Sequence, residues 1–431
     1  MSVNAKTTPK KRVQSLQDRL GHSAKLNPKR RYGNLFDKVY RNDVLHEAWR
    51  RVSRNRGAPG VDGQSIQWIR ENGVDEFLAD IATCLKAERY HPLHVKRVYI
   101  AKPDGSQRPL GIPAVIDRVV QMAVKLVIEP LFEADFLSCS FGFRPKKSSH
   151  QAIRLIEDHL YRGYRWVVDV DLKSYFDTIA HEPLLEMVQQ RVTDRKIVRL
   201  IRYWLKAGVL EDGVVTYPEL GSPQGGVLSP LLANIYLHRV DQEWQKRQPR
   251  EVLVRYADDM LIMCPTQADA ERAYSRLQEV LSELSLTLNA SKTRITAARD
   301  GFDFLGFSFR RGFYTRRGCR REIIIKVPRA KAEKAMRAKI KKQIKSIKLG
   351  DALDSTVPLL NRRLRGWVGY FRISNVRPAL KGLVRYACEQ LRLHLRRRFH
   401  RKRSQYSRRW PDGLFHQHYG LLTVSELLPG S

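Results

Sequence analysis

The sequence predicts an α+β core with antiparallel strand pairing, followed by a basic helical region. Strands and helices alternate irregularly up to about residue 326, which disfavours a doubly wound parallel sheet. Residues 252–263 form an apolar run interrupted by two adjacent carboxylates, Asp258 and Asp259, as expected for two strands joined by a tight turn. After residue 326 Gly and Pro become sparse and helical periodicity takes over.

The elements follow from local patterns. Residues 1–33 are polar and basic and predict a flexible or weakly helical arm. Apolar residues at helical spacing predict helices over 35–56, 74–88, 114–133, 183–208, 230–247 and 267–285. Apolar and β-branched runs predict strands at 95–101, 166–172, 213–217 and 302–309, besides the pair around Asp258.

The charge of the chain predicts a polyanionic partner. Its 431 residues carry a formal net charge of +35. Residues 326–409 contribute 26 Lys and Arg against four Asp and Glu. Nucleic acid is the first expectation and an anionic membrane is the alternative. No apolar stretch of about 18 residues and no hydrophobic leader occur, so we expect neither insertion nor secretion, and a cytoplasmic bacterial protein.

The five cysteines are scattered and form no Cys-x-x-Cys pair. We therefore expect reduced thiols and no zinc site.

Asp258 and Asp259 are the first candidate catalytic residues. Ionised carboxylates within an apolar run need a counter-charge, and carboxylate oxygens favour Mg²⁺. The alternative is a surface turn with two solvated Asp residues. Asp169 and Asp171 share one face of the strand at 166–172. Separate segments thus supply the carboxylates that two-metal phosphoryl transfer requires.

Two neighbouring acids have simpler interpretations. We expect Asp169 to be a structural carboxylate paired with a basic residue. We expect Asp177 to cap the N-terminus of a helix.

The chain resembles the bacterial group II intron-encoded reverse transcriptases/maturases over residues 35–398. The resemblance rests on ordered blocks at 57–63, 100–105, 108–113, 117–121, 140–145, 171–177, 221–234, 256–259, 288–293 and 304–307. It implies a right-hand polymerase, with fingers and palm followed by a helical thumb and a basic helical maturase domain. The expected divisions are a template-binding N-terminal extension at 1–75, fingers and palm at 76–315, and thumb and maturase domain at 316–431, with the boundary between 310 and 328.

The resemblance also implies site residues. The metal-binding positions are Asp171, Leu172, Asp258 and Asp259, of which the three acids are catalytic; they would hold two Mg²⁺ ions, with Mn²⁺ as a substitute. The residues expected to bind the incoming dNTP are Lys102, Arg108, Phe176, Gln224 and Lys292. Those expected to contact primer or template are Arg144, Gly225, Leu305 and Gly306.

Plainer interpretations stand beside these roles. Lys102 and Arg108 could be solvated loop charges, and Lys292 a charged helix end. Phe176, expected as an aromatic wall against a ribose 2′-hydroxyl, could be ordinary core packing, and residues 304–307 a plain buried strand, although that would not explain Gly306.

The basic C-terminal region resembles the thumb and maturase domain. Arg contacts phosphates and aromatic rings stack on exposed bases in RNA-binding proteins. The expected RNA contacts are Arg362, Arg363, Arg365, Trp367 and Tyr370. The alternative is a basic face that only keeps the domain in solution.

The expected function is RNA-directed DNA polymerisation combined with assistance to splicing of an intron RNA. The partners would be the group II intron RNA, an RNA template with a DNA primer, dNTPs and target DNA, for a monomer or homodimer. With no cysteine pairs for an HNH domain, we expect no DNA endonuclease activity. The alternatives are a splicing cofactor without polymerase activity and a domesticated reverse transcriptase serving DNA repair or phage defence.

Overall fold

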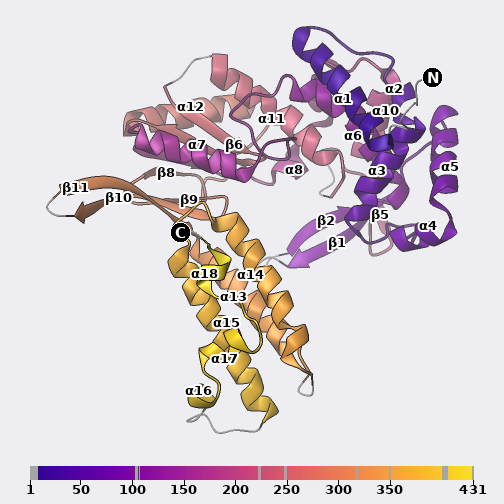
Figure 1. Cartoon of the computed structure of the whole chain (residues 1–431). Helices are drawn as coiled ribbons and strands as arrows, with labels where there is room; N and C mark the ends of the chain where they lie inside the picture. Colours follow the sequence, from indigo (N-terminus) through magenta and orange to yellow (C-terminus); the bar gives the residue numbers. More distant parts are fainter. Residues whose placement is uncertain are drawn as a thin grey trace, which may run out of the picture. The chain divides into compact units, whose positions relative to one another are not determined.

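A computed structural model describes residues 8–101, 105, 107–221, 225–246, 250–316, 319–348, 351–399 and 406–429 (Figure 1). The chain forms two compact units. The first contains Met1–Ala152, Val168–Met263 and Ala268–Arg294; the second contains Ile153–Val167, Cys264–Gln267 and Ile295–Ser431. No helix in these described ranges is long and apolar enough to cross a membrane.

Helices dominate the N-terminal part of the first unit. They are α1 (Pro9–Leu26), α2 (Phe36–Val39), α3 (Asn42–Arg54), α4 (Ile66–Asn72), α5 (Val74–Lys86) and α6 (Val115–Glu133). The prediction of a flexible or weakly helical arm is wrong for α1, which packs against α6 and buries Val13, Leu16 and Ala24. Three small or medium apolar residues among many basic ones left little periodicity in the sequence.

Two four-stranded sheets follow. The first has the order β2-β1-β4-β5 and contains β1 (Val95–Ala101), β2 (Gln107–Ile112), β4 (Val209–Glu211) and β5 (Val214–Thr216). The second has the order β6-β7-β3-β8 and contains β3 (Trp166–Val170), β6 (Val252–Tyr256), β7 (Asp259–Cys264) and β8 (Arg294–Ala297). The predicted strand pair around Asp258 is confirmed as the antiparallel hairpin β6–β7.

The helices between these strands are α7 (Ser149–Tyr161), α8 (Tyr175–Thr178), α9 (His181–Gln189), α10 (Arg195–Leu205), α11 (Ser229–Lys246) and α12 (Gln267–Glu283). The single helix predicted over 183–208 is wrong, because Asp194 begins a new helix there by accepting a hydrogen bond from the Lys196 amide. Asp177 is also not the predicted N-cap: it lies inside α8, and Ser174 precedes that helix.

The second unit combines a three-stranded sheet with a helical bundle. The sheet has the order β11-β10-β9 and contains β9 (Phe302–Phe304), β10 (Phe307–Arg316) and β11 (Cys319–Pro328). The helical elements are α13 (Ala330–Lys345), η1 (Leu353–Ser355), α14 (Val357–Phe371), α15 (Arg377–Arg398), α16 (Tyr406–Arg409), α17 (Asp412–Gln417) and α18 (Val424–Leu427).

Leu360, Leu364, Leu383 and Leu391 lie in the buried core of this bundle. The region 310–328, where we expected a domain boundary, is occupied by the hairpin β10–β11.

Candidate active site

The centre of the candidate site is the turn of hairpin β6–β7. Tyr256 pairs with Asp259, so Ala257 and Asp258 form a two-residue connection. Ala257 has a φ of 58°, in the left-handed region. A residue with a Cβ pays roughly 1–2 kcal/mol for that conformation, so the surrounding structure must hold it in place.

The segment 140–144 packs directly against this turn. A Cβ on Gly142 would lie 2.3 Å from the Ala257 nitrogen and 2.8 Å from the Tyr256 carbonyl carbon. The Asn234 side-chain amide donates to the Gly142 carbonyl at 2.8 Å. Only glycine permits this close approach, so Gly142 and Asn234 together fix one side of the turn.

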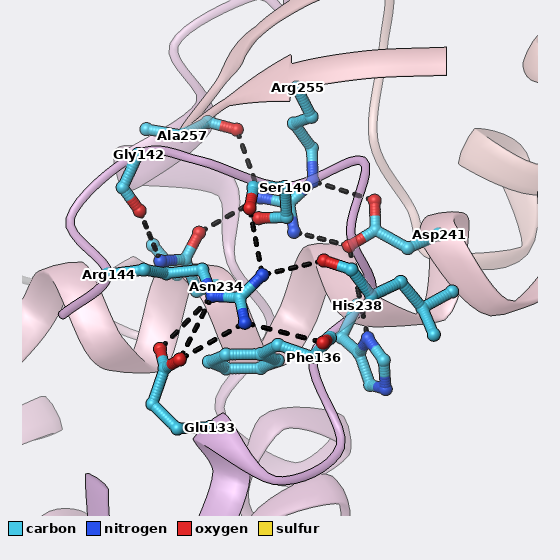
Figure 2. Close-up of polar contacts among 12 residues, drawn as sticks. Glu133, Phe136, Ser140, Gly142, Arg144, Asn234, His238, Asp241, Arg255 and Ala257 are labelled. Atoms are coloured by element: carbon cyan, nitrogen blue, oxygen red, sulfur yellow. Dashed lines mark hydrogen bonds and ion pairs between the residues drawn. The ribbon is translucent and has the colours of Figure 1, made fainter. Parts of the chain in front are cut away.

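Arg255 supports the turn from inside the protein (Figure 2). Its side chain is fully buried and forms an ion pair with buried Asp241. Its Nη1 donates to Asn234 Oδ1 at 2.9 Å and to the Ala257 carbonyl at 3.2 Å. Burial alone would raise the pKa of Asp241, but the adjacent guanidinium outweighs burial and lowers that pKa. Sequence reasoning missed Arg255, although a charge inside an apolar strand was a visible signal.

Arg144 also lies in this interior, and the expectation that it contacts primer or template remains a prediction. Its guanidinium is buried and binds the Glu133 carboxylate at 3.1 Å. The remaining donors reach the carbonyls of Phe136, Leu137 and Ser140. These bonds use all the donors of the side chain, so Arg144 fixes the loop after α6.

Asp171 directly follows β3, which ends at Val170, whereas the sequence predicted that Asp171 lies inside a strand at 166–172. Its carbonyl accepts a hydrogen bond from the Asn289 amide at 2.8 Å. The Lys292 Nζ lies 3.5 Å from Asp171 Oδ2, in a solvent-accessible ion pair. The structure thus brings Lys292 to the acidic cluster. The Leu172 side chain is a buried hydrocarbon without a donor atom, so only the backbone carbonyl of this residue could serve a metal ion.

The acids at the turn share one electrostatic field. Burial raises the pKa of Asp258, and the charge of Asp171 adds to this shift. Reduced hydration raises the pKa of Asp259 to about 6, and the charges of Asp258, Asp169 and Asp171 contribute, although the side chain is accessible to solvent. The positive charge of Arg108 acts to lower the pKa of Asp258 and of Asp259. The structure therefore also brings this expected residue near the cluster.

This excess of negative charge suits a cation. Hydration is reduced, and the charges of Asp258, Asp169 and Asp171 act on Asp259, so a bound divalent ion would remove an unfavourable interaction. Among the described residues, no three His, Cys, Asp or Glu side chains are already arranged as a coordination sphere. The donor set nevertheless fits Mg²⁺, which retains water and takes carboxylate and phosphate oxygens.

Two further expected site residues are Phe176, predicted to bind the incoming dNTP, and Gly225, predicted to contact primer or template. Phe176 is half-buried on α8 and its ring packs edge-on against Tyr175 at 5.3 Å. Gly225 has a φ of 116°, and a Cβ there would lie 2.2 Å from the Gly111 carbonyl oxygen. Glycine is therefore required where the loop before α11 meets β2. Lys102 and Gln224 lie outside the described residues.

In the second unit, Leu305 and Gly306 connect β9 to β10. Both have positive φ values, 46° and 83°, as in a type I′ hairpin turn. The Tyr370 hydroxyl donates to the Leu305 carbonyl at 2.8 Å. The Tyr370 hydroxyl therefore holds this turn, and because the side chain is half-buried, its expected contact with RNA remains a prediction.

Trp367 is another expected RNA contact, and that expectation remains a prediction. It is half-buried and its ring lies 4.7 Å from that of Phe371. By contrast, Arg362, Arg363 and Arg365 are exposed on α14, as RNA contacts would require.

Comparison with known proteins identifies the family. The family described as reverse transcriptase (RNA-dependent DNA polymerase) matches residues 100–309, and the group II intron, maturase-specific domain matches residues 333–410. Protein YkfC of Escherichia coli is 36% identical over 334 residues, covering 68% of this chain and 87% of YkfC. The chain belongs to the group II intron reverse transcriptase/maturase family.

A further relative of this reverse transcriptase/maturase is the group II intron-encoded protein LtrA of Lactococcus lactis subsp. cremoris. It is 34% identical over 260 residues, covering 58% of this chain and 42% of LtrA. A chain of the solved structure entitled "Partial Cas6-RT-Cas1--Cas2 complex" is similar, with 22% identity and a TM-score of 0.36. The match covers 58% of the present chain and 41% of the chain in that complex.

Proposed function

We propose that this reverse transcriptase/maturase copies RNA into DNA by two-metal nucleotidyl transfer and binds the RNA of its own group II intron. The observation that carries the proposal is that the charges of Asp258, Asp169 and Asp171 act together on Asp259, as expected where carboxylates gather to hold a cation. In right-hand terms, β1 and β2 belong to the fingers, and the sheet β6-β7-β3-β8 belongs to the palm. The helices from α13 onward form the thumb and the RNA-binding domain.

The carboxylates of Asp171, Asp258 and Asp259, with the Leu172 carbonyl, would hold two Mg²⁺ ions. When bound, the ions supply a lowered pKa for the primer 3′-hydroxyl and charge neutralisation for the leaving pyrophosphate. Arg108 would bind the triphosphate, and this role is supported by its charge, which already acts on Asp258 and Asp259. The close approach of Gly225 to Gly111 keeps side chains out of this part of the site.

Phe176 and Lys292 would complete nucleotide binding. The half-buried ring of Phe176 offers a flat wall against a ribose 2′-hydroxyl, which favours deoxynucleotides. Lys292, 3.5 Å from Asp171, can exchange this accessible ion pair for a phosphate oxygen. Gln224 and Lys102 remain proposed contacts on the resemblance alone.

Primer extension tests the polymerase proposal. The purified protein, an RNA template with an annealed DNA primer, dNTPs and Mg²⁺ should give cDNA. Asp258→Asn should lower the rate on the order of a thousandfold, since charge stabilisation through a metal ligand is worth several kcal/mol. Asp80→Asn, at an exposed acid on α5, is the matched control and should extend like wild type. Wild-type extension by Asp258→Asn would remove the metal assignment.

The maturase part of the proposal rests on the exposed arginines of α14. A helical domain with so much positive charge should bind structured RNA with a steep salt dependence. The triple substitution of Arg362, Arg363 and Arg365 by Gln should reduce the slope of log affinity against log salt by roughly two to three. An unchanged slope would place the RNA contacts elsewhere.

A further inference from the structure

Hairpin β10–β11 is longer than its packing requires. The two strands form an antiparallel ladder from Phe307↔Pro328 to Arg316↔Cys319. Near its base, Phe307 and Phe309 are buried, and β10 pairs with β9 on its other edge. Beyond this base the hairpin continues as a two-stranded ribbon. We call residues 310–316 and 319–323 the outer ribbon.

The outer ribbon exposes aromatic rings on both faces. Phe313 and Tyr314 are adjacent in the strand and are 58% and 54% exposed. Because neighbouring strand residues point to opposite faces, each face carries one ring. Two-stranded ribbons are marginally stable alone, and large exposed apolar groups add an aggregation hazard. A free surface explains these rings poorly, whereas a binding surface explains both.

Each ring is accompanied by an arginine. The Arg320 guanidinium lies over the Phe313 ring, 3.8 Å from its centroid. On the other face, Tyr314 pairs across the strands with Arg321. The one acid of the outer ribbon, Glu322, already forms an ion pair with Arg311. Within the described part of the chain, neither Arg320 nor Arg321 has an acidic partner, so the surface carries uncompensated positive charge.

The outer ribbon also lies outside both domains that the comparisons identify. The reverse transcriptase match ends at residue 309, and the maturase-specific match begins at residue 333. Its role therefore does not follow from either domain.

We infer that the outer ribbon binds an unpaired segment of RNA. Phosphates would neutralise Arg320 and Arg321, and unpaired bases would stack on Phe313 and Tyr314. A paired helix hides its base faces, which is why an unpaired segment fits better. The choice of RNA rests on the proposed function, in which the chain handles RNA as template and intron. An acidic protein surface would match the charge but would leave both rings without a specific partner.

The native cysteines provide a local reporter. Cys319 is exposed at the start of β11, while the other four cysteines are buried or half-buried. A thiol-reactive fluorophore on Cys319 of the full-length protein would report binding at the outer ribbon and not at other RNA-binding surfaces. The ligands are a single-stranded RNA oligonucleotide, its DNA counterpart and a blunt RNA duplex.

Tyr314→Thr is the main variant, because threonine keeps a strand-forming residue and removes the ring. Stacking on one aromatic ring predicts roughly tenfold weaker binding of single-stranded RNA at the labelled site. Arg321→Gln should weaken binding and reduce its salt dependence. Thr315→Ser, at an exposed neighbouring position, is the matched control and should bind like wild type. Circular dichroism of each variant separates lost binding from lost strand structure.

The result expected is a fluorescence response to single-stranded RNA that Tyr314→Thr weakens while the response to duplex changes less than about twofold. Unchanged affinity in Tyr314→Thr, or a loss confined to DNA, would overturn the inference. Primer extension by the same wild-type preparation keeps the two proposals apart. If extension occurs but the label does not respond to RNA, only the ribbon inference fails. If extension is absent, the proposed polymerase function fails, and the response of the label still decides the ribbon inference.

Discussion

Hairpins β6–β7 and β10–β11 use arginine in opposite environments. In β6–β7, Arg255 is fully buried, paired with Asp241, and bonded to the carbonyl of Ala257. In β10–β11, Arg320 and Arg321 are exposed and lie beside aromatic rings. The same side chain thus fixes backbone in one hairpin and offers charge to a ligand in the other. Burial and the presence of an acid decide between these roles.

Arg255→Ala should give the largest effect on stability. It removes the guanidinium from buried Asp241 and leaves His238 Nδ1, 3.8 Å away, near that carboxylate. Loss of a buried ion-pair partner costs about 3–5 kcal/mol in the free energy of unfolding. Arg321→Ala, the counterpart on the exposed hairpin, should change that free energy by less than about 0.5 kcal/mol. Urea denaturation of both variants measures the difference. Equal losses would mean that burial does not separate the two arginines.

Gly142→Ala should have the next largest effect on stability. The added Cβ would lie 2.3 Å from the Ala257 nitrogen, so the backbone of the turn must shift. Overpacking of this kind costs about 1–3 kcal/mol, and displacement of Asp258 should lower the single-turnover rate of extension as well. Gly366→Ala is the control, because nothing lies within 4 Å of that added Cβ on α14. A Gly142→Ala protein with wild-type rate would show that the turn tolerates movement.

The pH dependence should differ between the hairpins. The pKa of Asp259 is raised to about 6, so protons compete with Mg²⁺ as the pH falls through this value. The apparent Mg²⁺ affinity in primer extension should therefore be constant above pH 6 and fall toward tenfold per pH unit below it, as for one displaced proton. RNA binding at the outer ribbon should stay constant between about pH 5 and 8, because arginine remains charged. Mg²⁺ titrations across this range decide whether the site behaves as a coupled acid cluster.

Ala257→Gly should have the smallest effect. Glycine adopts the φ of 58° without the penalty of a Cβ, but it also gains freedom in the unfolded chain. These terms oppose each other, so the free energy of unfolding should change by less than about 1 kcal/mol. A loss of several kcal/mol would show that the Ala257 methyl group packs in a way that glycine cannot replace.

The sequence predicted the class of fold and most of its regular elements, because long amphipathic helices and apolar strands leave strong periodic patterns. The resemblance also predicted that Asp171, Asp258 and Lys292 lie in one site, because their motifs follow the order known in the family. It did not reveal α1 or the extent of β10–β11. Their few buried residues stand among charged ones, so tertiary packing and not local pattern determines these elements.

Residue type and family resemblance do not disclose how a side chain is held. Arg144, Trp367 and Tyr370 are residue types that bind nucleic acid when exposed, and their contacts were predicted from the resemblance to the family. In the structure the Arg144 guanidinium donates to backbone carbonyls and binds the Glu133 carboxylate. The Tyr370 hydroxyl donates to the Leu305 carbonyl. Arg255 was overlooked for the converse reason, since its importance arises from distant partners on α11. Burial is a property of the folded chain that residue type does not disclose.

The hydrogen bond from Tyr370 to the Leu305 carbonyl bears on how this protein could have evolved. It joins a turn inside the reverse transcriptase match to a helix inside the maturase-specific match. A gene fragment ending at residue 309 would encode the turn and omit the hydroxyl that holds it. Recombination between these two domains would separate the partners, so selection should favour their inheritance as one block.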